Sequence, residues 1–183
     1  MGFPALGTER MQLVEITKEH AGSFYDILSK DEVTRMYGMD SLVGIEEALQ
    51  LIDSMEKSYS SSRGIRWGMI DKATNRLIGT AGLNQLNKGS RRAEIGCELH
   101  PSYWGKGYAS EAVKEILDYS FSTLGLFRIG AVTYPDNHAS IILLEKLGFR
   151  KEGTLRGYLH QRGQSHDALV FSLLQPEWKK REN

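Results

Sequence analysis

Apolar residues recur along the chain with two different periods, and the alternation of these periods predicts the fold class. In residues 93–99 they occupy every second position, as in a strand with one buried face. From Ala109 to Leu117 they recur three and four residues apart, which places them on one face of a helix. The same criteria predict further strands near 11–16, 67–70, 77–83, 128–134, 151–158 and 165–174, and further helices near 18–28, 45–59 and 139–147. This order predicts an α/β (α+β) fold: a mixed, mostly antiparallel, twisted sheet with helices on both faces.

No repeat, low-complexity tract or linker divides the chain, and 183 residues suffice for one substantial core. We therefore expect residues 1–183 to form a single domain whose core spans about 9–176. Residues 1–10 contain Pro4 and Gly7, which predicts a loose lead-in to the first strand.

Composition narrows the classes of partner. Lys plus Arg and Asp plus Glu both number 23, so the net charge of zero gives no reason to expect nucleic acid. No unbroken apolar run is longer than the four residues 141–144, whereas a transmembrane helix needs about 20. Cys97 is the single cysteine, which excludes an internal disulfide and fits a reducing compartment; we expect a cytoplasmic protein.

The segment WGKGYASEA, residues 104–112, stands between the strand-like and helix-like runs of the middle of the chain. A helix start leaves backbone N–H groups without partners, and the helix dipole adds partial positive charge there. Gly105 and Gly107 allow positive φ angles and a close approach of the backbone to a ligand. Such a turn binds phosphate groups through amides, so we expect a phosphorylated cofactor here.

Two common phosphate motifs do not fit this segment. A dinucleotide fingerprint would have a third glycine where Ser110 stands, and a P-loop would end in Gly-Lys-Ser/Thr. Residues 104–109 instead resemble the [Q/R]-x-x-G-x-[G/A] loop of the GCN5-related N-acetyltransferases (GNAT), with Trp104 in place of the usual Gln or Arg. WGKGYASEA is similar to the variant found in the RimJ/RimL-type ribosomal-protein N-terminal acetyltransferases.

Two further segments carry the same resemblance in the same order. Residues 137–149 are similar to the N-x-x-[SA]…E-K-x-G-F signature of these acetyltransferases, and residues 167–178 to the family's last strand. The resemblance implies acetyl-CoA (coenzyme A) as cofactor, with its pantetheine arm along residues 93–99. The implied cofactor-binding residues are Cys97, Glu98, Leu99, Trp104, Gly105, Lys106, Gly107, Tyr108, Ala109, Ser110 and Asn137.

Acyl transfer to an amine also needs help for the leaving thiolate, and Ser140 is the candidate. It shares a predicted helix face with Leu143, Leu144 and Leu147, so it should point inward. Many relatives carry a tyrosine as general acid where Leu144 stands, whereas a serine at the Ser140 position has been proposed for RimJ/RimL-type enzymes. A serine that bonds back to its own helix is the alternative. Asn137 is expected to cap this helix, to bind the cofactor, or both.

The general base is sought on the strand 93–99, where Glu94 and Glu98 share one face. Glu94 matches a position that is often acidic in the family, and we assign it to catalysis; a solvated carboxylate paired with Arg91, Arg92 or Lys88 is the alternative. His160 and His166 are expected to be bystanders. An α-amine has a pKa of about 7.7–8.0 against about 10.4 for lysine, so a weak base suits an N-terminal acceptor.

The expected function is therefore acetyl-CoA-dependent transfer of acetyl to a primary amine by direct attack, with a protein or peptide N-terminus as the acceptor. The alternatives are a polyamine or aminoglycoside acetyltransferase, for which an acidic pocket would be needed, and a non-catalytic acyl-CoA-binding module. Acids that would serve such a pocket are Asp31, Glu32, Asp40, Glu46 and Glu47. No metal-ligand spacing occurs, so we expect no metal. Because many members of the family dimerise, the resemblance also suggests a homodimer.

Overall fold

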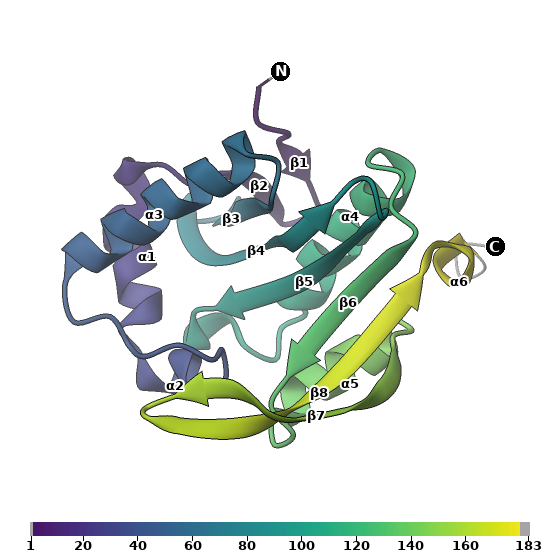
Figure 1. Ribbon diagram of the computed structural model, residues 1–183. Helices are drawn as coiled ribbons and strands as arrows, with labels where there is room; N and C mark the ends of the chain where they lie inside the picture. The colour runs from purple at the N-terminus through teal and green to yellow at the C-terminus, as the bar shows by residue number, and fades with distance from the viewer. Residues whose placement is uncertain (1, 180–183) are drawn as a thin grey trace.

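The computed structural model describes residues 2–179 (Figure 1). In chain order the elements are β1 (Leu6–Gly7), β2 (Met11–Glu15), a 3-10 turn (Lys18–His20), α1 (Ala21–Leu28), α2 (Asp31–Thr34), α3 (Ile45–Ser60), β3 (Ile65–Asp71), β4 (Arg76–Asn87), β5 (Arg92–Leu99), a second 3-10 turn (Pro101–Tyr103), α4 (Tyr108–Ser122), β6 (Arg128–Thr133), α5 (His138–Lys146), β7 (Arg150–Gln161), β8 (Gln164–Leu174) and α6 (Gln175–Lys179).

All eight strands form one sheet in the order β1-β2-β3-β4-β5-β6-β8-β7. Only β5 and β6 are parallel, because the helix α4 carries the chain back between them; the other neighbours are antiparallel. Helices α1 and α3 cover one face, and α4 and α5 lie behind the other (Figure 1). The expected mixed, mostly antiparallel sheet with helices on both faces is confirmed.

The two faces bury separate sets of apolar side chains. Trp67, Ile116 and Phe171 belong to the larger cluster, which involves α4 and α5. Phe24 and Ile52 belong to the smaller cluster, which joins α1 and α3 to the sheet. Every second residue of β5 contributes to the larger cluster, as its period of two predicted.

The predicted strands and helices are present, and their ends differ in several places. Helix α3 ends at Ser60, one residue beyond the expected end, and β4 and β7 are longer than expected. The short elements β1, α2 and α6 were not predicted, because two to five residues carry too little periodicity to recognise.

The expectation of a loose lead-in was wrong for the part of residues 1–10 that the structure describes. Leu6 pairs with Leu13 across β1 and β2, and the indole Nε1 of Trp67 donates to the carbonyl of Pro4 at 2.6 Å. The bond from Trp67 to Pro4 spans 63 positions, and a strand of two residues carries too little periodicity to recognise, so local composition revealed neither contact.

The feature that positions the site is the separation of β5 from β6. Their pairing covers only three positions, Arg92 with Arg128 to Glu94 with Gly130. Beyond this point each strand continues, β5 to Leu99 and β6 to Thr133, and no further pairing joins them in the described register. The sheet is therefore split in its middle at the carboxyl ends of two parallel strands.

Candidate active site

The split exposes one edge of β5. The N–H of His100 donates to the carbonyl of Ile78 at 2.8 Å, so the backbone groups of even-numbered residues face β4. By the alternation of a strand, the groups of Cys97 and Leu99 face the split instead. The indole Nε1 of Trp104 donates to the Leu99 carbonyl at 2.8 Å, which agrees with that direction. A free strand edge at Cys97 is suited to pair with an amide-containing chain.

Backbone amides gather where β5 leads into α4. Gly105 has φ +70° and Gly107, the N-cap of α4, has φ +84°, conformations that favour glycine. Counting from Gly105 along the chain, the first backbone N–H with a hydrogen bond is that of Glu111, which donates to the Gly107 carbonyl at 3.0 Å. Within the described chain, the six N–H groups of residues 105–110 make no hydrogen bond. Together with the dipole of α4 they form a cradle for an anion.

Side chains of the same loop hold it in place. Trp104 is anchored on Leu99, and the ammonium of Lys106 donates to the Ser102 carbonyl at 2.8 Å. Tyr108 packs edge-on against Tyr103, with 5.3 Å between ring centroids. The predicted residues 104–110 therefore lie together, and the free groups they offer a ligand are backbone amides.

Asn137 and Ser140 lie at the start of α5, on the other side of the split. Asn137 is the N-cap: its Oδ1 accepts from the Ser140 N–H at 3.2 Å, and its Nδ2 donates to the Met36 carbonyl at 3.3 Å. Ser140 is half-buried, and its hydroxyl makes no hydrogen bond to any residue in the described range. Leu144 is 7 % exposed and packs in the core, so no general acid stands there.

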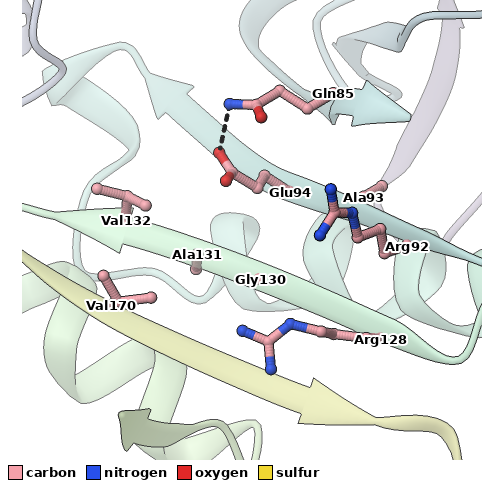
Figure 2. A pocket seen from close by; sticks show the side chains of 9 residues that line it. All are labelled: Gln85, Arg92, Ala93, Glu94, Arg128, Gly130, Ala131, Val132 and Val170. Carbon is pink, nitrogen blue, oxygen red and sulfur yellow. Dashed lines mark hydrogen bonds between the residues drawn. The ribbon is translucent and has the colours of Figure 1, made fainter. Parts of the chain in front are cut away.

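Glu94 lies in a cavity at the point where β5 and β6 separate (Figure 2). The cavity measures about 170 Å³, and its wall includes Arg92, Arg128 and Gln85. Gln85 Nε2 donates to the Glu94 carboxylate at 3.2 Å. Burial raises the pKa of Glu94 above its ordinary value, and the positive charges of Arg128 and Arg92 oppose that rise.

Glu98 does not join Glu94, although both were placed on one face of the strand. Its carboxylate accepts from Arg66 Nη2 at 2.7 Å and from the Thr80 hydroxyl, and its side chain is 2 % exposed. Its backbone faces β4, which leaves it no free group toward the split. Its partner is Arg66 of β3. Sequence proximity had suggested Arg91, Arg92 or Lys88 as partners on this strand.

The Cys97 thiol packs against the larger core cluster. Burial raises its pKa to about 12, which keeps the thiol protonated near neutral pH and disfavours a role as nucleophile. What Cys97 offers the split is its backbone.

Sequence reasoning missed a polar clamp on residues 31–44. Gln161, at the end of β7, accepts from the Tyr134 hydroxyl at 2.8 Å and donates to the carbonyls of Thr34 and Met39. Together with the bond from Asn137 Nδ2 to the Met36 carbonyl, these bonds fix residues 34–39 beside β7 and the start of α5. A glutamine beside a hairpin turn gives no signal in a single sequence. His166 packs edge-on against Tyr134, and His160 is exposed.

Coenzyme A fits these residues on three counts. Six free amides at a helix start suit a diphosphate, and the open edge of β5 suits the amides of a pantetheine arm. The third count is the hydroxyl of Thr133 on β6, which is buried and has no hydrogen-bond partner among the described residues. Such a group is expected to gain a partner from a ligand.

The fold and the site define an acyltransferase of the GNAT type, and comparison with known proteins agrees. The Acetyltransferase (GNAT) domain family matches residues 10–150. The chain is 46% identical over 174 residues to the uncharacterized N-acetyltransferase YoaA of Bacillus subtilis (strain 168), covering 95% of this chain and 98% of that protein. It is 32% identical over 136 residues to the ribosomal protein uS5 alanine N-acetyltransferase of Escherichia coli (strain K12), covering 74% and 69% of the two chains.

A solved structure, the spermidine N-acetyltransferase from Vibrio cholerae in complex with CoA and spermine, superposes with a TM-score of 0.81 at 24% identity, covering 93% of this chain and 98% of that one. The chain belongs to the GNAT acetyltransferase family. It is an N-acetyltransferase that uses acetyl-CoA. Among the described residues, no helix is long and apolar enough to cross a membrane.

Proposed function

We propose that the acceptor is the N-terminal α-amine of a protein or peptide, which attacks the acetyl group directly with no covalent enzyme intermediate. Acetyl-CoA supplies the activated acetyl group when bound. In this proposal Glu94 takes the proton that the amine loses, and Ser140 donates a hydrogen bond to the departing sulfur. The amides of residues 105–110 hold the diphosphate, and the edge of β5 at Cys97 holds the pantetheine arm.

The charge around Glu94 is the observation that carries the choice of acceptor. The cavity has one carboxylate, Glu94, and two guanidinium groups, Arg92 and Arg128. Arg128 is already paired with Glu152, to which its Nη1 donates at 2.7 Å and its Nη2 at 2.5 Å, so the net charge of these four groups is zero. A polyamine keeps further positive charges while one amine reacts, and this cavity offers those charges no excess of negative charge. A peptide with a single α-amine brings fewer charges, and its carbonyl groups can accept hydrogen bonds from arginine.

The raised pKa of Glu94 supports the same choice. Burial brings this carboxylate closer to the range in which it can accept a proton at neutral pH. An α-amine with a pKa near 8 needs only such modest help, whereas a lysine near 10.4 would need a stronger base.

Acidic residues near 31–47 are the feature that favours a polyamine instead. One of them is neutralised: Asp31 forms an ion pair with Arg162 at the tip of the β7–β8 hairpin. Another, Glu47, accepts from the Val43 N–H at 2.7 Å and thus ties the first turn of α3 to the residue before its N-cap. Glu32, Asp40 and Glu46 are exposed, as expected for a solvated surface.

The test is an acceptor panel with a free-thiol readout of coenzyme A release. The panel contains peptides with free N-termini, the same peptides with an acetylated N-terminus and one internal lysine, spermidine, spermine and an aminoglycoside. We expect the highest kcat/KM for peptides with a free N-terminus and almost none for their blocked counterparts. Spermidine turnover above that of every peptide would contradict the proposal.

A further inference from the structure

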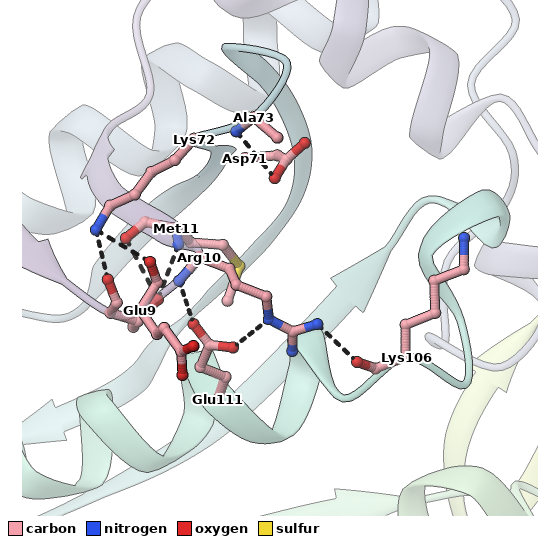
Figure 3. Close-up of polar contacts among 9 residues, drawn as sticks. Glu9, Arg10, Met11, Asp71, Lys72, Ala73, Lys106 and Glu111 are labelled. Carbon is pink, nitrogen blue, oxygen red and sulfur yellow. Dashed lines mark hydrogen bonds and ion pairs between the residues drawn. The ribbon is translucent and has the colours of Figure 1, made fainter.

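Arg10 reaches the phosphate-binding loop from the opposite end of the chain. It precedes β2, yet its Nη1 donates to the carbonyl of Lys106 at 2.9 Å (Figure 3). Its guanidinium lies 4.0 Å from the centroid of the Tyr108 ring, and its Nη2 is 3.4 Å from the position that a Cβ on Gly107 would occupy. Arg10 therefore touches three consecutive residues of the cradle.

Glu111 fixes the guanidinium in that place. Its two carboxylate oxygens accept from the backbone N–H of Arg10 at 2.8 Å and from Nε at 2.7 Å. Burial acts to raise the pKa of Glu111, but hydrogen bonds from Thr8 and Arg10 together lower it, so the carboxylate stays ionised near neutral pH. Arg10 is thereby held at both its backbone and its side chain.

The bond to Lys106 determines which way the next amide points. The carbonyl of Lys106 and the N–H of Gly107 belong to one planar trans peptide, in which they point in opposite directions. Gly107, which follows this peptide, has a positive φ, and glycine adopts φ angles of either sign, so the loop by itself does not strongly restrict this peptide. When Arg10 holds the carbonyl, the Gly107 N–H is directed to the other side of the loop.

We propose that Arg10 is a positioning residue for the diphosphate of coenzyme A, acting through the Lys106–Gly107 peptide. The proposal rests on the assignment of residues 105–110 to the diphosphate. It extends the binding unit to a residue in the N-terminal segment that touches neither the acetyl group nor the acceptor. Arg10 should therefore affect the affinity for ligands that carry the diphosphate and not for ligands that lack it.

Arg10→Met tests this proposal, because methionine keeps an unbranched stem against Tyr108 but has no donor. Lys72→Met is the matched control: Lys72 also ties the N-terminal segment down, through the carbonyls of Thr8 and Glu9, but it does not contact the loop. Calorimetric titration with coenzyme A should give a Kd raised roughly tenfold in Arg10→Met, as expected for the loss of a charge-assisted hydrogen bond. The control should stay within about twofold of the wild type.

The donor S-acetylpantetheine separates positioning from general damage, because it has no diphosphate. With an amine from the acceptor panel, kcat/KM for this donor should be equal in Arg10→Met and the wild type, while the KM for acetyl-CoA rises and kcat at saturation is unchanged. An equal loss with both donors, or an unchanged Kd for coenzyme A, would overturn the proposal.

Two more variants complete the experiment. If Arg10→Met does not fold, Glu111→Gln releases the guanidinium with little change of shape, and a raised Kd for coenzyme A is again expected; an unchanged Kd overturns the proposal. Gly107→Glu tests the cradle itself. A Kd unaffected in both Gly107→Glu and Arg10→Met would refute the site assignment, whereas a Kd affected in Gly107→Glu alone would refute only the role of Arg10.

Discussion

Ser140 lies at the start of α5 and Glu94 near the start of β5, and each presents one polar group whose chemistry can be tested alone. Ser140 has a hydroxyl with no hydrogen bond within residues 2–179, so it can turn toward a ligand without breaking an existing contact. Glu94 sits in a cavity where, among the residues that the structure describes, Gln85 alone donates a hydrogen bond to it. Neither is needed to hold the backbone, so their loss should affect rate more than folding.

Ser140→Ala should lower kcat by roughly ten- to a hundredfold, because the departing thiolate loses a hydrogen bond in the transition state. The Kd for coenzyme A should stay within about twofold, since the proposed diphosphate contacts lie elsewhere. Steady-state kinetics and calorimetry on the same preparation check both numbers. An unchanged kcat would remove Ser140 from the mechanism.

Glu94→Gln should abolish one limb of the pH profile of kcat. A base must be deprotonated to accept a proton, so activity rises as the pH passes the pKa of Glu94. Because burial raises that pKa, this rise should lie above about pH 4.3, the ordinary pKa of glutamate. Activity should therefore rise with pH through that limb in the wild type and in Glu94→Asp, but not in Glu94→Gln. The limb persisting in Glu94→Gln would show that another group is the base.

Helix α5 begins with a residue that serves two elements at once. Asn137 caps α5 through Oδ1 and holds residues 35–39 through Nδ2 on Met36. Arg10 makes a comparable link between β2 and the start of α4. Both sides of the split are thus braced by contacts between elements that are far apart in the sequence.

Asn137→Ala should lower the free energy of unfolding by about 1 kcal/mol, the usual cost of a lost N-cap. Asn137→Asp keeps the acceptor for the Ser140 N–H but loses the donor to Met36, so it should recover most of this stability. Hydrogen exchange of amides near Met36 should be faster in both variants. Urea midpoints that are equally low for Ala and Asp would mean that the cap is not the source of the stability.

In the molecule as a whole, local features were predictable and contacts across the fold were not. The strand 93–99, the helix after Gly107 and the cap at Asn137 follow from spacing and residue type within a few positions, and the sequence predicted them. The Glu98–Arg66 pair, the Gln161 clamp and the Arg10 bridge join residues 27 to 127 positions apart. A single sequence has no periodicity that reports such pairs.

The buried pair of Arg66 and Glu98 is the clearest test of these long-range contacts. Glu98→Leu would leave the guanidinium buried without its partner and should cost about 3–5 kcal/mol of unfolding free energy. The double variant Arg66→Met/Glu98→Leu should recover most of that loss, because neither charge then remains. Urea unfolding of the two single variants and the double variant measures the coupling. A cost below about 1 kcal/mol for Glu98→Leu would show that the pair is solvated.

The proposed mechanism depends on the amides of residues 105–110 binding the diphosphate of coenzyme A. The most direct test is a calorimetric titration of the wild type, Gly107→Ala and Gly107→Glu with coenzyme A. Alanine adds only the strain of a side chain at φ +84°, whereas glutamate also adds a negative charge beside the phosphates. We predict saturable binding to the wild type, weaker binding to Gly107→Ala and none to Gly107→Glu. Equal affinity in all three proteins, or no binding to the wild type, would contradict the account.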